Sequence, residues 1–182
     1  LAYSTVSNLS YILMGAALMT NAGLTGALTH LVFHALMKIT LFYCAGAILV
    51  KTNREYVQEM RGLAKAMPFT CAVFTFASLA LTGVPPLLGF ASKWNLATAA
   101  IDSGLIAGYV GAGALIVSAV LTAVYLLSVV VPMYTRPLEG TLPAEKCDPG
   151  LPMKLSLGVL CLAMLVMSFS AANVTEWLGH IL

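Results

Sequence analysis

Charged residues are scarce in this sequence. Lys, Arg, Asp and Glu together make up 9% of its 182 residues, whereas 60% of the residues are hydrophobic. A soluble domain of this size with so few charges would expose apolar side chains over most of its surface. The composition therefore excludes a soluble globular domain and predicts an integral membrane protein. The net charge of +2 is also too small for the basic surface that nucleic-acid binding requires.

The cysteines also lack a functional pattern. The chain has four, and no two of them have the C-x-x-C spacing that is typical of metal and redox sites. They are Cys44, Cys71, Cys147 and Cys161. Three lie in apolar runs, where cysteine packs as a small hydrophobic residue. We therefore expect neither a metal site nor a disulfide framework, and no bound cofactor.

Apolar runs divide the chain into five predicted membrane segments, one of them discontinuous: 1–20, 24–50, 68–101, 105–133 and 153–172. Each is long enough for the roughly 20 residues that cross a bilayer as a helix. A short loop at 21–23 makes the first two an antiparallel pair, and the polar stretch 51–67 suits an amphipathic surface helix. The fold class is thus an all-α polytopic membrane protein with a single transmembrane domain. Because the chain opens with Leu1 inside an apolar run, we expect it to be the C-terminal part of a longer protein.

The basic residues follow the membrane topology. Seven of the nine Lys and Arg residues lie in or directly beside the loops 51–67 and 134–152, which a five-segment chain places on one side. The loops on the other side hold none, so the positive-inside rule predicts that 51–67 and 134–152 are cytoplasmic. The other two basic residues, Lys38 and Lys93, fall within membrane segments. All acidic residues lie in loops or in the C-terminal tail.

Three ionisable residues form a stripe on the second segment. His30, His34 and Lys38 are spaced four apart, so they share one face of a helix. A charged group at bilayer depth costs about 2.5–3.5 kcal/mol on insertion scales, which makes a functional role the default interpretation. The structural alternative is that the histidines bond to carbonyl groups and that the lysine reaches the headgroups. Lys38 lies about 18 Å from the cytoplasmic end of its segment, too far for such a reach, and the stripe is therefore predicted to be a proton relay.

The third segment is predicted to be a broken helix. As one straight helix its 34 residues would measure about 51 Å, well beyond a bilayer core of about 30 Å. The residues expected at the break are Gly83, Pro85, Pro86 and Gly89. Because proline has no N–H group, the carbonyls of Leu81 and Thr82 lose their helical partners. Such carbonyls persist at membrane depth only beside protein or water, so we expect a hydrated break.

Lys93 follows this break by one helical turn. A broken helix with an ionisable residue beside it is the sequence pattern of a transport site. Two alternatives are a lysine that reaches the outer headgroups and a lysine that carries a covalent cofactor. The second is disfavoured because a protonated Schiff base needs a carboxylate counter-ion, and no acidic residue lies within a membrane segment.

Three motifs occur in order along the chain. They are LAYSTVSNLSYILMG, H-x-x-x-H-A-x-x-K-x-x-L-F and G-x-P-P-x-x-G-F-x-S-K. Together they resemble the antiporter-like, proton-translocating subunits of respiratory complex I, membrane-bound hydrogenases and Mrp cation/proton antiporters. The phrases GFASKW and MRGLAKAMPFT look closest to Mrp D-type and hydrogenase subunits.

The resemblance implies that the chain is part of a larger inverted-repeat helix bundle. It places His30, His34 and Lys38 on the family's central hydrophilic axis and Lys93 at a broken helix. The Glu and Lys pair that the family carries in its first repeat has no counterpart in this sequence. A complete path from the cytoplasm is therefore not expected within these residues.

The function that the sequence favours is proton translocation in a redox-driven complex, either a complex I-like NADH:quinone oxidoreductase or a membrane hydrogenase. One alternative is a subunit of a multi-subunit sodium/proton antiporter of the Mrp type, and another is a structural membrane scaffold. The sequence has no flavin, iron–sulfur or quinone-reduction signature, so catalytic chemistry would belong to partner subunits. The expected partners are other membrane subunits, protons and the lipid bilayer, with sodium added in the antiporter alternative. We expect a multi-pass protein of a prokaryotic inner membrane.

Overall fold

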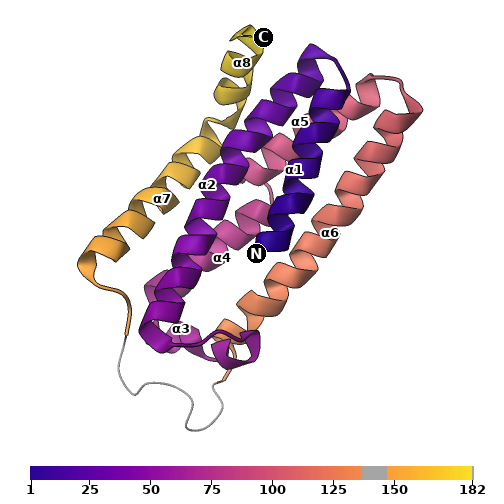
Figure 1. The fold of residues 1–182 in the computed structure, drawn as a ribbon. Helices are drawn as coiled ribbons and strands as arrows, with labels where there is room; N and C mark the ends of the chain where they lie inside the picture. The colour runs from indigo at the N-terminus through magenta and orange to yellow at the C-terminus, as the bar shows by residue number, and fades with distance from the viewer. Residues whose placement is uncertain (137–146, 182) are drawn as a thin grey trace.

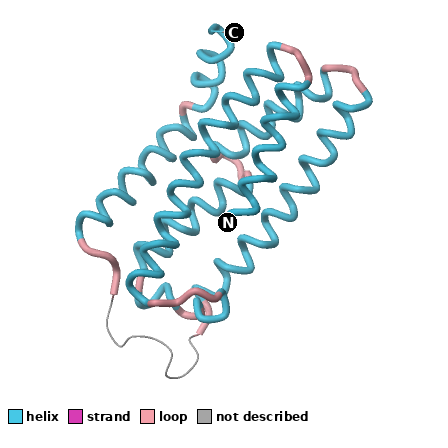
Figure 2. The backbone as a smooth tube through the Cα atoms, viewed as in Figure 1, coloured by secondary structure: helices cyan, strands magenta, loops and turns pink. Residues whose placement is uncertain are grey.

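The computed structural model describes residues 1–136 and 147–181, and within these ranges every regular element is a helix (Figure 2). Much of the predicted loop 134–152 falls outside the described residues. In chain order the elements are α1 (Ala2–Ala17), α2 (Asn21–Thr52), η1 (Val57–Met60), α3 (Leu63–Ala66), α4 (Pro68–Thr82), α5 (Leu88–Asp102), α6 (Ile106–Tyr134), α7 (Leu151–Phe169) and α8 (Ala171–Ile181).

Three of these helices, α2, α6 and α7, are long and apolar enough to cross a membrane. Helix α1 has 16 residues, and α4 and α5 have 15 each. Each of these three helices is therefore only about 22–24 Å long. The prediction of an all-helical, multi-pass membrane protein is therefore confirmed.

The third predicted segment is interrupted where its proline pair lies. Helix α4 ends at Thr82 and α5 begins at Leu88. Gly83 closes α4 in the left-handed conformation, with φ of 96°, which glycine adopts without steric cost. The structure thus breaks the helix within the predicted stretch 83–89.

Two predicted boundaries differ from the structure. The first turn lies at 18–20 instead of 21–23, because the Thr20 side chain accepts the N–H of Gly23 at 3.0 Å and starts α2 earlier. The stretch 51–67 contains only the short helices η1 and α3, so the prediction of an amphipathic surface helix there was wrong. Asn53 and Gly62 adopt left-handed conformations, which interrupt a continuous helix.

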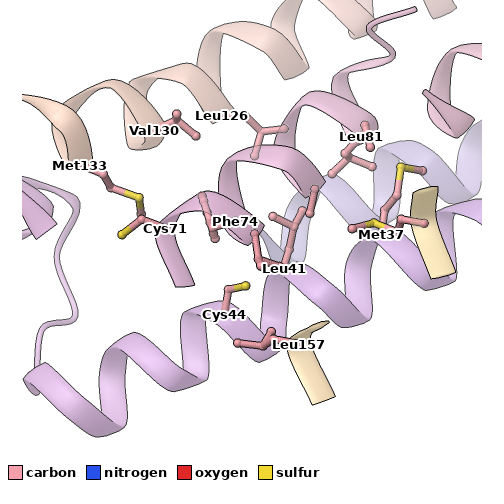
Figure 3. Packing of buried hydrophobic residues seen from close by; sticks show 14 of the residues in the cluster. Met37, Leu41, Cys44, Cys71, Phe74, Leu81, Leu126, Val130, Met133 and Leu157 are labelled. Carbon is pink, nitrogen blue, oxygen red and sulfur yellow. The ribbon is translucent and has the colours of Figure 1, made fainter. Parts of the chain in front are cut away.

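Helix α2 runs through the middle of the bundle and contacts α1, α4, α5, α7 and α8 (Figure 1). The turns α1–α2 and α5–α6 lie at one end, and η1 and α3 lie at the other. Figure 3 shows the largest apolar cluster, in which Leu41 and Cys44 of α2 pack with Cys71 and Phe74 of α4. A smaller cluster around Leu96 lies towards the other end. One face of α2 is therefore enclosed by protein, whereas the opposite face is exposed, as at Ile39.

Helix α7 and the turn before it cap both halves of the broken helix. The Asp148 carboxylate accepts the N–H groups of Phe69 and Thr70 at the start of α4, each at 3.4 Å. The Ser168 hydroxyl accepts the N–H of Leu88 at the start of α5, at 3.1 Å. Neither helix has a capping side chain of its own at its N-cap position. The α7 segment therefore supplies hydrogen-bond acceptors to the N-termini of both helices, and Ser168 does so at the break itself.

Replacing Ser168 with alanine is expected to destabilise the protein by about 0.5–2 kcal/mol, the usual cost of losing a helix cap. The thermal unfolding midpoint in detergent measures this change. Ser156→Ala is the matched control, because among the described residues the exposed Ser156 hydroxyl bonds only to the carbonyl of Pro152 in its own helix. Equal midpoints for the two variants would show that the Ser168 cap contributes no stability.

Candidate functional site

The three residues of the predicted stripe lie side by side in the interior of the bundle. His30 is 0% exposed, His34 is 4% exposed and Lys38 is 5% exposed. The His30 and His34 rings stack with their centroids 5.9 Å apart and an interplanar angle of 13°. The Nε2 atom of His34 is buried and has no partner among the described residues. It remains available to a water molecule or a proton.

Neutral oxygen atoms surround the Lys38 ammonium group. Its Nζ donates to the backbone carbonyl of Leu1 at 2.6 Å and to the Ser4 hydroxyl. It also lies 5.7 Å from the centroid of the Phe42 ring, which is cation–π distance. Among the described residues no carboxylate pairs with Lys38. Losing its proton would therefore leave no unpaired acidic group behind.

The Lys93 side chain on α5 reaches back to the break between α4 and α5. Its side chain is 5% exposed, and Nζ donates to the carbonyls of Leu81 at 2.8 Å and of Thr82 at 3.0 Å. These are the two carbonyls that Pro85 and Pro86 leave without N–H donors. The ammonium group thus takes the place of two backbone donors, and Lys93 is held between α4 and α5.

Small polar residues that sequence reasoning missed connect these groups. The Asn8 amide Nδ2 donates to the carbonyl of Ser4 at 2.7 Å, and Asn8 Oδ1 lies 3.3 Å from His30 Nε2. On the other side of the ring, His30 Nδ1 lies 2.9 Å from the Ser92 hydroxyl. A chain of hydrogen-bonding residues therefore runs from Lys38 through Ser4, Asn8 and His30 to Ser92, the residue before Lys93.

A sequence signal for some of these residues existed. Ser4 and Asn8 are spaced four apart on the first segment, which repeats the spacing of the ionisable stripe on the second. Two polar stripes on helices that form a hairpin can face each other, as they do here. These residues are neutral, so a search for groups that change their charge does not find them.

A small cavity lies beside Lys38. It has a volume of about 270 Å³ and opens between α1 and α6. Six hydroxyl-bearing residues line it: Tyr3, Ser4, Ser7, Ser118, Thr122 and Tyr125. Because Ser4 also accepts a hydrogen bond from Lys38, this cavity offers water a polar approach to the buried ammonium group.

No group of three or more His, Cys, Asp and Glu side chains within 1–136 and 147–181 is arranged to hold a metal ion. Cys44 and Cys71 are buried in the apolar cluster as free thiols, the packing role that the sequence predicted for them.

Comparison with known proteins gives matches over most of the chain. Residues 1–132 match the family described as "NADH:quinone oxidoreductase/Mrp antiporter, TM". The NADH-quinone oxidoreductase subunit N of Desulforudis audaxviator is 39% identical over 152 residues, which cover 82% of this chain and 30% of that protein. The chain thus spans about a third of the length of this relative.

Solved structures show the same arrangement of helices. A chain of the Mrp complex from Dietzia sp. DQ12-45-1b superposes with a TM-score of 0.83 at 26% identity, covering 96% of this chain and 40% of the other. A chain of the archaeal membrane-bound sulfane sulfur reductase superposes with a TM-score of 0.77 at 30% identity, covering 92% of this chain and 27% of the other.

Proposed function

From the premise that the chain belongs to the NADH:quinone oxidoreductase/Mrp antiporter transmembrane family, we propose that it translocates protons as a membrane subunit of a redox-driven complex. The complex is of the complex I-like NADH:quinone oxidoreductase or membrane-hydrogenase kind. The observation that carries the proposal is the set of four buried basic side chains, His30, His34, Lys38 and Lys93, without a carboxylate partner among the described residues. Basic groups in structural ion pairs have acidic partners, and these four have none within the described part of the chain. Basic groups that carry protons instead have to gain and lose their charge.

The proposed path runs along the middle of α2 and ends at the broken helix. Lys38 is the central relay, His34 and His30 extend the path, and Lys93 acts as a gate between α4 and α5. Water molecules bridge the gaps between these groups. Because like charges repel strongly in a medium of low dielectric constant, a proton loaded at one site favours release from the next. This repulsion couples the sites without any catalytic chemistry in the chain.

The proposal includes a membrane topology. Helices α1, α2, α6 and α7 cross the membrane, and α4 and α5 together make the fifth, discontinuous crossing of a single transmembrane domain. The bundle is one part of a larger inverted-repeat assembly with other membrane subunits. The basic loop 51–67 lies at one end of the bundle (Figure 1), and we place that end and the loop 134–152 in the cytoplasm of a prokaryotic cell.

A sodium/proton antiporter of the Mrp type is the second candidate. The superposition on a chain of the Mrp complex over 96% of this chain supports it. The two candidates differ in what drives transport. In vesicles that contain the whole complex, sodium alone moves protons if the antiporter candidate is right, whereas an electron donor is required if the redox-driven candidate is right.

Lys93 variants test the proposal directly. Lys93→Ala is expected to lower proton transport in membrane vesicles several-fold, because the break then lacks a group that can carry the proton. Lys93→Glu is expected to retain part of the activity, since a carboxylate can also gain and lose a proton. Transport is followed with a pH-sensitive dye after the complex is energised.

Lys65→Ala is the control, because Lys65 is exposed on α3 at the end of the bundle. Its transport rate should equal that of the unmodified protein. If Lys93→Ala also transports at the unmodified rate, the relay proposal fails and the scaffold alternative gains support.

A further inference from the structure

His30 is held on both sides by residues that have no charge of their own. We infer that Asn8 and Ser92 are positioning residues that keep the neutral His30 ring protonated at Nε2, so that the ring exchanges its second proton only at Nδ1, on the side of α5. The inference deepens the proposed function and rests on it for its physiological meaning. The geometry of the two contacts carries it.

The orientation of the Asn8 amide decides the tautomer. Its Nδ2 group donates to the carbonyl of Ser4 at 2.7 Å within α1, which turns Oδ1 towards His30. An amide oxygen only accepts hydrogen bonds. The His30 Nε2 atom, 3.3 Å away, therefore has to carry the hydrogen. Asn8 is 1% exposed, so solvent does not compete for this contact.

The opposite nitrogen of the ring faces a hydroxyl group that can change from hydrogen-bond donor to acceptor. With hydrogen on Nε2, the neutral ring accepts at Nδ1 from the Ser92 hydroxyl, at 2.9 Å. Ser92 has a second acceptor within reach, the carbonyl of Gly89 at 3.3 Å. When a proton arrives at Nδ1, the Ser92 hydrogen can rotate to Gly89 and its oxygen can accept from the new Nδ1–H. Gain and loss of the proton then require a hydroxyl rotation and no movement of a heavy atom.

The residues around His30 determine the side on which its Nδ1 exchanges a proton. Ser92 directly precedes Lys93 on α5, and the ring of His34 stacks on His30 from within α2. Both His34 and Lys93 are ionisable. The edge of the Tyr11 ring covers another side of the imidazole, with the ring centroids 5.7 Å apart. The nitrogen free to exchange a proton therefore faces the broken helix.

Nitrogen-15 NMR of the protein labelled at histidine reads the tautomer without any transport assay. The chain has three histidines, and His30→Gln identifies the His30 signals by their loss. We expect a protonated Nε2 and an unprotonated Nδ1 for the neutral ring. Asn8→Leu, which removes the acceptor at similar volume, is expected to give a mixture of both tautomers. A neutral ring protonated at Nδ1 in the unmodified protein would overturn the inference.

Transport by variants of Ser92 tests the role of the hydroxyl group. Ser92→Ala is expected to lower proton transport roughly three- to tenfold, the loss associated with one hydrogen bond, and Ser92→Thr should restore it. The control is Thr98→Ala on the same helix, because within the described part of the chain the Thr98 hydroxyl bonds only to the carbonyls of Trp94 and Asn95. If Lys93→Ala stops transport while Ser92→Ala does not, only this inference fails. If Lys93→Ala leaves transport intact, the proposed function fails first.

Discussion

Lys38→Ala is expected to lower proton transport at least about tenfold, which corresponds to an increase of roughly 1.4 kcal/mol in the transfer barrier. Lys38 lies midway along α2, where its ammonium group contacts Leu1, Ser4 and Phe42 and nothing acidic among the described residues. An alanine there leaves no group that can hold a proton between the hydroxyl-lined cavity and the histidines. Removing a buried cation without a paired acid should leave the fold intact.

A second variant at the same position separates charge from proton exchange. Lys38→Arg keeps a positive charge, but a guanidinium group does not release its proton in proteins. Transport by Lys38→Arg should therefore be as low as that of Lys38→Ala, measured with the pH-sensitive dye at equal amounts of complex. Activity of the arginine variant equal to that of the unmodified protein would show that Lys38 supplies only a fixed charge.

Gly89→Ala is expected to destabilise the protein by about 1–3 kcal/mol or more, the usual cost of overpacking. A Cβ atom at Gly89 would overlap the backbone carbonyl oxygen of Ala80 in α4 and would also approach the sulfur of Met37. Because a backbone atom cannot move aside as a flexible side chain can, α4 and α5 would be pushed apart. The Lys93 contacts with Leu81 and Thr82 span these two helices, so transport should fall together with stability.

Gly113→Ala is the matched control on α6. A Cβ atom at Gly113 meets no heavy atom within 4 Å, and alanine favours a helix by about 1 kcal/mol over glycine. The thermal unfolding midpoint should fall for Gly89→Ala and stay equal or rise for Gly113→Ala. Similar midpoints for both variants would mean that the close approach of α4 and α5 is not needed for stability.

The position of the site between two apolar clusters suits a controlled path. Towards α3, side chains such as Leu41 and Phe74 fill the bundle, and towards the α1–α2 turn Leu96 packs with Tyr11. In the proposed function, these apolar clusters flank the relay, so protons move between groups that bind them and not through a continuous open pore.

Some features of this protein follow from the sequence alone, because they depend on composition or on neighbours along the chain. The scarcity of charge requires a membrane environment. The four-residue spacing of His30, His34 and Lys38 puts them on one face of any helix. The pair Pro85–Pro86 removes two donors and breaks the third segment, and the stranded carbonyls can be named in advance. The number of crossings and the roles of the ionisable residues remain proposals from that pattern.

Other features depended on the tertiary structure. No local pattern shows that the Lys93 ammonium group satisfies the carbonyls stranded by the proline pair, that Ser168 caps α5 or that Ser92 faces His30. These contacts require helices from distant parts of the chain to match within about 3 Å, the length of a hydrogen bond. Helical periodicity gives the face on which a residue lies, but the rotation and depth of one helix against another come from packing. The sequence alone therefore determined which groups are ionisable and buried, and only the packing of α1, α2 and α5 decided which neutral partners they meet.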